Sequence, residues 1–307
     1  MTKVLLATEK PFAASAVSGI RAILDGAGFE TILLEKYSSK SELLQAVADV
    51  QAIIVRSDII DAEVLDAAKE LKIVVRAGAG YDNIDLDAAT KHGVCVMNTP
   101  GQNANAVAEL VVGMLLFGIR NHFNGTSGTE LMGKKIGLLA FGATGRNVAR
   151  IAKGLAMEVY AYDPFSSKEQ MEAEGVHFIA TQAELFATCD IVSMHIPATP
   201  ETKGSIGKAL VGSMPKKAIL VNTARKEIIN EAELLEVLKE REDLRYFTDI
   251  QPACHAEMVE ALGERYFATP KKMGAQTSEA NTNAGLAAAR QIVGFIKDGN
   301  ERFRLNK

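Results

Sequence analysis

One segment of the chain, residues 134–163, carries the residue types that a dinucleotide-binding site needs, in the order in which it needs them. A short apolar stretch is followed by a turn with two glycines, by residues at helical spacing and by a second apolar stretch that ends in a carboxylate. Gly142 lets backbone N–H groups approach a pyrophosphate, and Gly145 lets the helix pack close to the preceding strand. The amino terminus of that helix adds partial positive charge. The segment therefore predicts a phosphate-binding turn.

Asp163, the carboxylate at the end of the second apolar stretch, indicates which dinucleotide binds. A carboxylate at this position can accept hydrogen bonds from an adenosine ribose, and its charge would repel the 2′-phosphate of NADP. The predicted cofactor is therefore NAD. One position departs from the G-x-G-x-x-G pattern, because Ala140 replaces its first glycine. The alternative is a tight turn in another kind of doubly wound domain, but the strand, the helix and the acid at the expected spacing favour the dinucleotide site.

Strand-like and helix-like segments alternate along almost the whole chain, which is typical of parallel sheets with helices on both faces. After the first five strands come a long apolar helix at residues 103–120 and a polar, hinge-like link at 125–128. A second alternation follows, and the last helix spans 278–298. The predicted strands lie near residues 4–7, 31–34, 52–55, 73–76, 94–97, 135–139, 159–162, 191–195, 218–221, 246–249 and 266–269. We expect an α/β fold of two doubly wound parallel-sheet (Rossmann or flavodoxin-like) domains with a cleft between them.

The composition excludes several classes of protein. The 307 residues are 48% hydrophobic, enough for large cores, and the net charge of −4 without a basic run argues against a nucleic-acid partner. The chain begins with a strand-like stretch rather than a signal peptide, and no apolar run reaches membrane-spanning length. Three cysteines without metal-ligand spacing predict no metal site and a reducing, cytoplasmic location. We expect no third, regulatory domain after the last helix.

Several further motifs occur together in one order: RAGAG at 76–80, DNID at 82–85, NTPG at 98–101, VAEL at 107–110, HIP at 195–197, NTAR at 222–225 and TD at 248–249. This set resembles the D-2-hydroxyacid dehydrogenase family, and within it the short phosphoglycerate dehydrogenases that carry a lysine in place of the catalytic histidine. The resemblance covers nearly the whole chain. It implies a discontinuous substrate-binding domain, 1–98 and 284–307, an NAD-binding domain, 99–283, and a homodimer formed through residues 103–120.

The resemblance also implies an activity, the NAD-dependent oxidation of D-3-phosphoglycerate to 3-phosphohydroxypyruvate at the first step toward serine. Two alternatives remain open. A hydroxypyruvate or glyoxylate reductase, or another D-2-hydroxyacid dehydrogenase, would share the catalytic core and lack the need for a phosphate. A non-enzymatic, NAD-sensing binding protein would share the fold, because fold alone does not decide function.

Arg225 is the residue expected to hold the substrate carboxylate. It follows the strand near 218–221 at its carboxyl end, where ligands of such sheets bind. A guanidinium there can bind the carboxylate of a 2-oxo acid with two hydrogen bonds and polarise the carbonyl. The alternative is a surface ion pair between Arg225 and Glu227.

Hydride transfer also requires a proton carrier. The family uses a histidine in P-H-x-G-A/G-x-T, whereas this chain has TPKKMGAQT at 269–277. Alignment on Gly274 and Ala275 places Lys272 at the histidine position, and alignment on Pro270 places Lys271 there. In an extended segment the two lysines point to opposite sides. We prefer Lys272 as the proton carrier.

The family's glutamate, which assists the histidine, is also replaced. Its position, five residues after Asp249, holds Cys254. The two replacements agree physically, because histidine, with a pKa near ~6.5, needs a carboxylate to remain a competent acid, whereas lysine, near ~10.4, does not. Partial burial and Arg225 should lower the lysine pKa toward a usable range. Glu257 could still approach the site, and His255 is the rival acid.

The remaining site residues are implied by position in the family's motifs. The residues expected to contact the cofactor, in addition to Asp163 and Asp249, are Gly142, Ala143, Thr144, Gly145, His195, Ile196, Thr223, Ala224, Gly274 and Ala275. The backbone of Ala143 and Thr144 would bind the pyrophosphate, and Asp249 would bind the nicotinamide carboxamide. The residues expected to contact the substrate are Arg56, Ser57, Ala77, Gly78 and Ala79, with Arg56 suited to a phosphate. The alternative for Arg56 is a solvated arginine at a strand end.

Overall fold

The computed structural model describes all residues, 1–307, and the chain divides into two compact units. Unit 1 comprises Met1–Asn103 and Gln276–Lys307, and unit 2 comprises Ala104–Ala275. Both units consist of a parallel sheet with helices on its two faces, so the predicted α/β class is confirmed. The predicted boundary at 98/99 falls shortly before the first crossing between units, and the predicted boundary at 283/284 falls inside the last helix.

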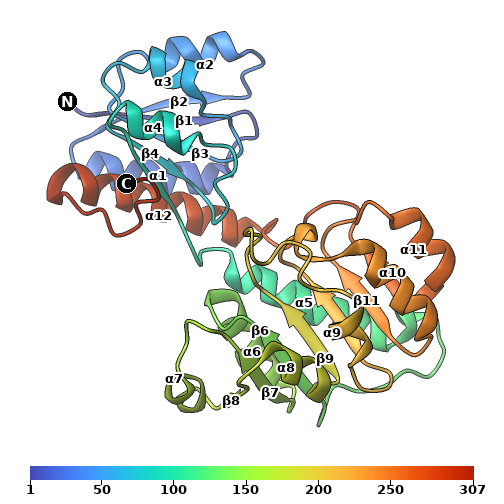
Figure 1. Ribbon diagram of the computed structural model, residues 1–307. Helices are drawn as coiled ribbons and strands as arrows, with labels where there is room; N and C mark the ends of the chain where they lie inside the picture. The colour runs from blue at the N-terminus through green and yellow to red at the C-terminus, as the bar shows by residue number, and fades with distance from the viewer. The chain divides into compact units, whose positions relative to one another are not determined.

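Unit 1 contains a five-stranded sheet in the order β2-β1-β3-β4-β5. Its elements are β1 (Lys3–Thr8), α1 (Ala14–Gly26), β2 (Glu30–Glu35), α2 (Lys40–Ala46), β3 (Ala52–Val55), α3 (Ala62–Ala67), β4 (Ile73–Arg76), α4 (Leu86–Lys91), β5 (Cys95–Asn98) and α12 (Ser278–Asp298). Val4 and Leu6 of β1 join a core with α1 and α12, whereas Leu5 and Ala7 join a core with α2, α3 and α4. The last helix of the chain thus packs beside α1 and covers one face of the sheet that the first residues form (Figure 1).

Unit 2 contains a seven-stranded sheet in the order β12-β11-β10-β9-β6-β7-β8. Its helices and strands are α5 (Ala104–Ile119), β6 (Lys135–Leu139), α6 (Ala143–Gly154), β7 (Glu158–Tyr162), α7 (Lys168–Ala173), β8 (His177–Phe178), α8 (Gln182–Thr188), β9 (Ile191–Met194), α9 (Lys208–Gly212), β10 (Ile219–Asn222), α10 (Glu231–Glu240), β11 (Arg245–Thr248), α11 (His255–Leu262) and β12 (Tyr266–Ala268), with short 3₁₀ turns at Asn121–Phe123, Lys226–Ile228 and Gly263–Arg265. The two-residue strand β8 was not predicted, because two residues carry no detectable periodicity.

The polar stretch 125–128 does not connect the two units. It lies inside unit 2, between α5 and β6. A Cβ on Gly128 would lie 2.3 Å from the backbone oxygen of Ile119, so this segment packs against the end of α5. The expectation of a hinge at these residues was therefore wrong, because glycines and small polar residues are also typical of tightly packed turns.

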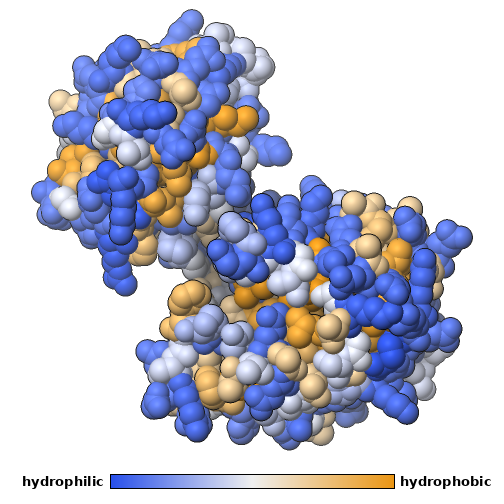
Figure 2. Space-filling view, viewed as in Figure 1, coloured by the Kyte–Doolittle hydropathy of each residue, from blue (hydrophilic) through white to orange (hydrophobic).

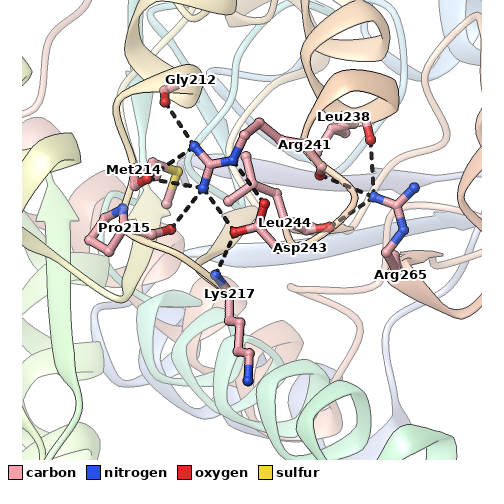
Figure 3. Close-up of polar contacts among 9 residues, drawn as sticks. All are labelled: Gly212, Met214, Pro215, Lys217, Leu238, Arg241, Asp243, Leu244 and Arg265. Atoms are coloured by element: carbon pink, nitrogen blue, oxygen red, sulfur yellow. Dashed lines mark hydrogen bonds and ion pairs between the residues drawn. The ribbon is translucent and has the colours of Figure 1, made fainter.

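A cluster of polar contacts fixes the segments that lead into β10 and β11 (Figure 3). The Arg241 guanidinium donates to both carboxylate oxygens of Asp243, at 2.8 and 2.9 Å, and this holds the pKa of that carboxyl well below its usual range. Asp243 also accepts from the backbone N–H of Lys217 at 2.7 Å. The same guanidinium donates to the backbone oxygens of Gly212, Met214 and Pro215. These contacts position two strands whose carboxyl ends carry candidate site residues.

The apolar residues lie in four buried clusters, one on each face of each sheet. Hydrophilic residues accordingly predominate on the face of the molecule shown in Figure 2. Among the helices, not one is both long enough and apolar enough to pass through a membrane. All three cysteines are free thiols, and no cluster of potential ligands suited to a metal ion is present.

Candidate active site

The glycine-containing turn joins β6 to α6 as the sequence predicts. Ala140 has a φ of +84°, a conformation that an L residue adopts only at a cost, so its position retains the backbone of the missing glycine. Gly142 is the N-cap of α6, and Ala143 and Thr144 are therefore in its first turn, where backbone N–H groups have no partner within the helix. A Cβ on Gly145 would lie 2.4 Å from the oxygen of Ala140. The turn thus needs glycine at position 145 for space, and it presents amides to an anion.

Asp163 follows β7 and lies beside this turn. Its Oδ2 accepts from the backbone N–H of Phe141 at 2.7 Å, and its Oδ1 accepts from that of Phe165 at 2.8 Å. Each carboxylate oxygen can accept about two hydrogen bonds, so one acceptor site on each oxygen is left. The nearly buried Asp163 can therefore brace the turn and also accept from ribose hydroxyls.

His195 follows β9 and lies beside the same turn. The Cβ position of Gly145 is 3.9 Å from its Cδ2, and its Nε2 is 3.0 Å from the Ser193 hydroxyl. Desolvation lowers the pKa of His195 to about 4, so the ring is neutral at neutral pH and does not act there as a cationic acid. Ile196, the next residue, is half-buried against the core of unit 2.

The carboxyl end of β10 forms a turn shaped by Asn222, a residue that sequence reasoning did not single out. Its side chain donates to the Arg225 oxygen at 2.9 Å and accepts from the Ala224 N–H at 3.0 Å. Thr223, within this turn, is buried, and its hydroxyl has no hydrogen-bond partner. A buried hydroxyl without a partner is costly, so it indicates a position where a ligand supplies the missing bond.

Two cationic side chains converge on one atom of this turn. Arg225 donates from Nη1 to the oxygen of Ala224 at 3.0 Å, and Lys272 donates from Nζ to the same oxygen at 3.4 Å. The distance between Arg225 Nη1 and Lys272 Nζ is therefore at most the sum of these two distances. Arg225 forms no ion pair with Glu227, which removes the alternative considered for it. Lys272 is exposed, so the partial burial expected for it is not present.

Asp249, at the end of β11, is fully buried and accepts three hydrogen bonds from one loop. Its Oδ1 accepts from the Thr269 hydroxyl at 3.0 Å and from the Met273 N–H at 2.7 Å, and its Oδ2 accepts from the Gly274 N–H at 2.8 Å. One of about four acceptor sites is left, on Oδ2. Asp249 therefore keeps one acceptor for the predicted bond to a carboxamide. Ala275, the next residue, is half-buried at the end of unit 2.

The residues considered as alternatives or partners to Lys272 in proton transfer, His255, Glu257 and Cys254, have other contacts. The Nδ1 atom of His255 is 2.9 Å from the Tyr266 hydroxyl, and Glu257 is exposed on α11. Burial, followed by the nearby Glu231 carboxylate, raises the pKa of the Cys254 thiol to about 11, so this thiol is neutral at neutral pH. Glu231 Oε2 accepts from the Cys254 N–H at 3.2 Å. A carboxylate is thus present beside position 254, although it comes from α10, and no local motif in the sequence could have indicated it.

In unit 1, Arg56 lies at the end of β3 and is half-buried. Its Nη1 donates to the oxygens of Lys10 and Pro11 at 3.0 and 3.1 Å, and its Nη2 donates to Asn281 Oδ1 at 2.7 Å. Three of the five guanidinium N–H donors are used in this way, so two are left for a ligand. Ser57 beside it is exposed. Arg56 is therefore a partly tethered cation rather than a freely solvated one.

The backbone donors predicted at residues 77–79 are not equivalent. The N–H of Ala77 donates to the backbone oxygen of Val55 at 2.8 Å, and the N–H of Gly78 donates to the backbone oxygen of Arg76 at 2.9 Å. Both amides are thus used within unit 1. Ala79 N–H has no such backbone acceptor, while the oxygen of Ala79 accepts from Asn98 at 2.6 Å. Of the three amides, that of Ala79 is the one positioned for a ligand.

Asp58, which sequence reasoning missed, organises the loops around Arg56. It is buried, its Oδ1 accepts from the Glu9 N–H and from the Tyr37 hydroxyl, both at 2.7 Å, and its Oδ2 accepts from the Arg56 N–H at 3.3 Å. Burial and this bond to Asp58 raise the pKa of Tyr37. The three loops therefore depend on one carboxylate, and its position two residues after an arginine was the only available signal.

The residues of unit 2 fit an NAD molecule on several independent features. These are the free first-turn amides of α6, the spare acceptor sites of Asp163 and Asp249, and the unpartnered hydroxyl of Thr223. The nearby pair of cations, Arg225 and Lys272, can bind a carboxylate and exchange a proton. Such a set of groups suits hydride transfer between a hydroxy acid and NAD.

Comparison with known proteins agrees with this chemistry. Residues 118–261 match a family described as "D-isomer specific 2-hydroxyacid dehydrogenase, NAD binding domain". The crystal structure of NAD⁺-bound 3-phosphoglycerate dehydrogenase from Entamoeba histolytica is 46% identical, covers 100% of this chain and 99% of its own, and has a TM-score of 0.88. The apo-structure of D-lactate dehydrogenase from Escherichia coli, at 23% identity and a TM-score of 0.80, covers 99% of this chain and 100% of its own and shares the fold.

Among curated sequences, D-3-phosphoglycerate dehydrogenase from Archaeoglobus fulgidus is 38% identical over 276 residues, which are 84% of this chain and 52% of that protein. The human enzyme of the same name is 35% identical over 296 residues, which are 90% of this chain and 54% of that protein. The chain thus spans about half the length of the curated relatives that it matches.

Proposed function

The chain belongs to the D-2-hydroxyacid dehydrogenase family, and from this premise we propose that it oxidises D-3-phosphoglycerate to 3-phosphohydroxypyruvate with NAD, the step that leads toward serine. The observation that carries the proposal is the convergence of Arg225 and Lys272 on the oxygen of Ala224. A cation that binds a carboxylate and a second that exchanges a proton are what a 2-hydroxy acid requires at its first two carbons. The relatives named above support the choice of substrate.

Each residue of this pair has a separate part in the mechanism. Arg225 binds the substrate carboxylate with its planar guanidinium and so fixes the orientation of C2. Lys272 Nζ removes the proton of the 2-hydroxyl as C2 loses hydride, and in the reverse direction it returns that proton to the carbonyl oxygen. Bound NAD supplies the hydride acceptor. His195, neutral beside the turn, lines the cofactor site and carries no proton in this scheme.

The phosphate of the substrate is assigned to Arg56. Two of its guanidinium N–H donors are left by its contacts with Lys10, Pro11 and Asn281. Those contacts hold the side chain in place before a ligand arrives, so less conformational entropy is lost on binding. Ser57 and the amide of Ala79 are the neighbouring donors that we assign to the substrate.

We also propose a homodimer formed through residues 103–120. One edge of α5, including Asn105, Glu109 and Leu116, is exposed, and Leu116 is 38% exposed. Most other residues of α5 are buried or half-buried in unit 2, so this edge is the part of the helix that we assign to association. The free thiols fit a reducing compartment, and we place the protein in the cytoplasm.

A substrate panel tests the proposed function. Initial rates with NAD are measured for D-3-phosphoglycerate, D-glycerate and D-lactate, and rates with NADH are measured for hydroxypyruvate. We expect D-3-phosphoglycerate to give a kcat/KM at least ~10-fold above D-glycerate, because one charge-assisted phosphate contact contributes about 1.5 kcal/mol or more. Equal values for the two would favour a hydroxypyruvate or glyoxylate reductase. Binding of NADH without turnover of any compound would favour an NAD-sensing protein.

A further inference from the structure

The carboxylate of Asp249 accepts hydrogen bonds from residues on both sides of Lys272 in the chain. Thr269, three residues before the lysine, donates its hydroxyl to Oδ1 at 3.0 Å, and Met273, the residue after it, donates its N–H to the same oxygen at 2.7 Å. Gly274 donates its N–H to Oδ2 at 2.8 Å. The Thr269 hydroxyl is also 2.9 Å from the oxygen of Lys271. One carboxylate therefore binds a side chain before Lys272 and two backbone amides after it.

This carboxylate is in a position that ordinarily disfavours a charge. Asp249 is 0% exposed, and donors from residues 269, 273 and 274 bind its carboxylate. A buried carboxylate is stable only if hydrogen-bond donors replace its water, and here the donors come from a single loop. Formation of that loop and burial of the charge are thus mutually dependent.

We propose that Asp249 is a positioning residue for Lys272, and that it fixes the loop from which Nζ reaches the oxygen of Ala224. The proposal rests on the proposed function of Lys272 as the proton carrier. Lysine has a long side chain with much rotamer freedom and is exposed here, so a fixed backbone limits the positions that Nζ can take near Arg225. A displacement of about 1 Å in a reacting group can cost on the order of 10²-fold in rate.

The packing around Gly274 supports this role. A Cβ at Gly274 would lie 2.9 Å from Asp249 Oδ2 and 3.2 Å from a methyl group of Val107 on α5. The loop is therefore pressed between the carboxylate and a helix, with no space for a side chain. Glycine at this position lets the amide approach Oδ2 closely enough for a 2.8 Å bond.

The first test is Asp249→Asn, which keeps the shape and removes one acceptor. Whichever way the new amide turns, its NH₂ group faces either the Met273 N–H or the Gly274 N–H, so one backbone donor loses its partner. We expect amide hydrogen exchange in a peptide covering 269–274, measured by mass spectrometry on the ligand-free protein, to become at least ~10-fold faster. Exchange at the wild-type rate in a folded variant would overturn the proposal.

A second pair of variants separates positioning from contact with the cofactor. Thr269→Val removes the hydroxyl at nearly constant volume, and Thr269→Ser restores it. We expect Thr269→Val to speed exchange in 269–274 and to lower kcat at saturating NAD, with the dissociation constant of NADH changed less than ~3-fold, and Thr269→Ser to recover most of both losses. Ser213→Ala, which removes a 2.7 Å side-chain bond to Leu210 elsewhere in unit 2, is the matched control and should change neither. Failure of Thr269→Ser to restore exchange would contradict the role of the hydroxyl.

The deciding measurement combines Asp249→Asn with Lys272→Met. If Asp249 acts on turnover through Lys272, the kcat of the double variant at saturating NAD should equal that of Lys272→Met within ~3-fold. Multiplied losses would mean that Asp249 acts elsewhere and would overturn the proposal. The exchange measurement needs no substrate. Fast exchange in Asp249→Asn together with inactivity of the wild-type protein toward D-3-phosphoglycerate would refute the proposed function and leave the loop assignment standing.

Discussion

Substitutions at the two ends of the predicted phosphate-binding turn should have opposite effects, one stabilising the protein and the other damaging the turn. Ala140 occupies the first glycine position of the motif and has a φ of +84°, and Gly145 occupies the third. Ala140→Gly should stabilise the protein because it relieves the backbone strain. Gly145→Ala should damage the site because its new Cβ would lie 2.4 Å from the oxygen of Ala140, which belongs to the backbone and cannot rotate away.

The size of the first effect follows from three terms. An L residue in a left-handed conformation costs about 1–2 kcal/mol relative to glycine. Against this, glycine lowers the free energy of unfolding by about 0.4–1 kcal/mol, because it gives the unfolded chain more conformational freedom. The loss of the half-buried methyl group of Ala140 lowers it by less than the ~0.8 kcal/mol of a fully buried CH₂. The net stabilisation of about 0.5 kcal/mol corresponds to a rise in Tm of roughly 1–2 °C for a domain of this size.

Calorimetry and NADH titration check the two variants. We expect Ala140→Gly to raise the Tm of the transition that includes unit 2 and to leave the dissociation constant of NADH within ~3-fold of its original value. We expect Gly145→Ala to weaken NADH at least ~10-fold, about 1.4 kcal/mol, because the turn must open to admit the methyl group. A lower Tm for Ala140→Gly, or unchanged NADH binding by Gly145→Ala, would refute this description of the turn.

Five further predictions concern the site and the assembly. Lys272→Met should lower kcat by roughly 10²–10⁴-fold with NAD affinity nearly unchanged, whereas Lys271→Met should remain active; the opposite result would shift the proton carrier by one residue. Because oxidation needs a neutral lysine and reduction a charged one, the oxidation rate should rise and the reduction rate fall through alkaline pH in steady-state profiles. Arg56→Ala should raise the KM for D-3-phosphoglycerate strongly and that for D-glycerate little, and an equal loss for both would assign Arg56 to the fold. The carboxylate of Asp163 predicts at least ~10-fold preference for NAD over NADP in kcat/KM. Light scattering should give the mass of a dimer at micromolar concentration, and the mass of a monomer would exclude the proposed interface through α5.

Local features of the site could be predicted from the sequence, because they depend on residues close together in the chain. The turn at Gly142 and Gly145 and the position of Asp163 after the next strand follow from spacing alone, and the structure has them as expected. The alternation of strands and helices likewise predicted two parallel sheets. The errors were local too: β8 is too short to leave a periodic signal, and the polar stretch at 125–128 has the composition of a link but packs as a turn.

The donors and acceptors around each site residue could not be predicted in this way. Arg56 meets Asn281 across 225 residues of sequence, and its remaining donors could be identified only when that contact was known. The sequence offered three equivalent amides at 77–79, but the sheet of unit 1 uses the amide of Ala77 and a local turn uses that of Gly78. A hydrogen bond depends on distances of tenths of an ångström between segments that folding brings together, and no residue pattern contains those distances.

The sequence by itself determined the kinds of chemical group present: a glycine-containing turn of the type that binds a pyrophosphate, a carboxylate after the next strand, and an arginine and a lysine that we propose as the catalytic pair. The tertiary structure decided how these groups are held. It placed Arg225 and Lys272 on one carbonyl oxygen, and it placed two amides of the lysine's loop on the buried carboxylate of Asp249. The physical reason is that charge and hydrogen-bonding capacity belong to a residue type, whereas burial and partners belong to a position in the folded chain.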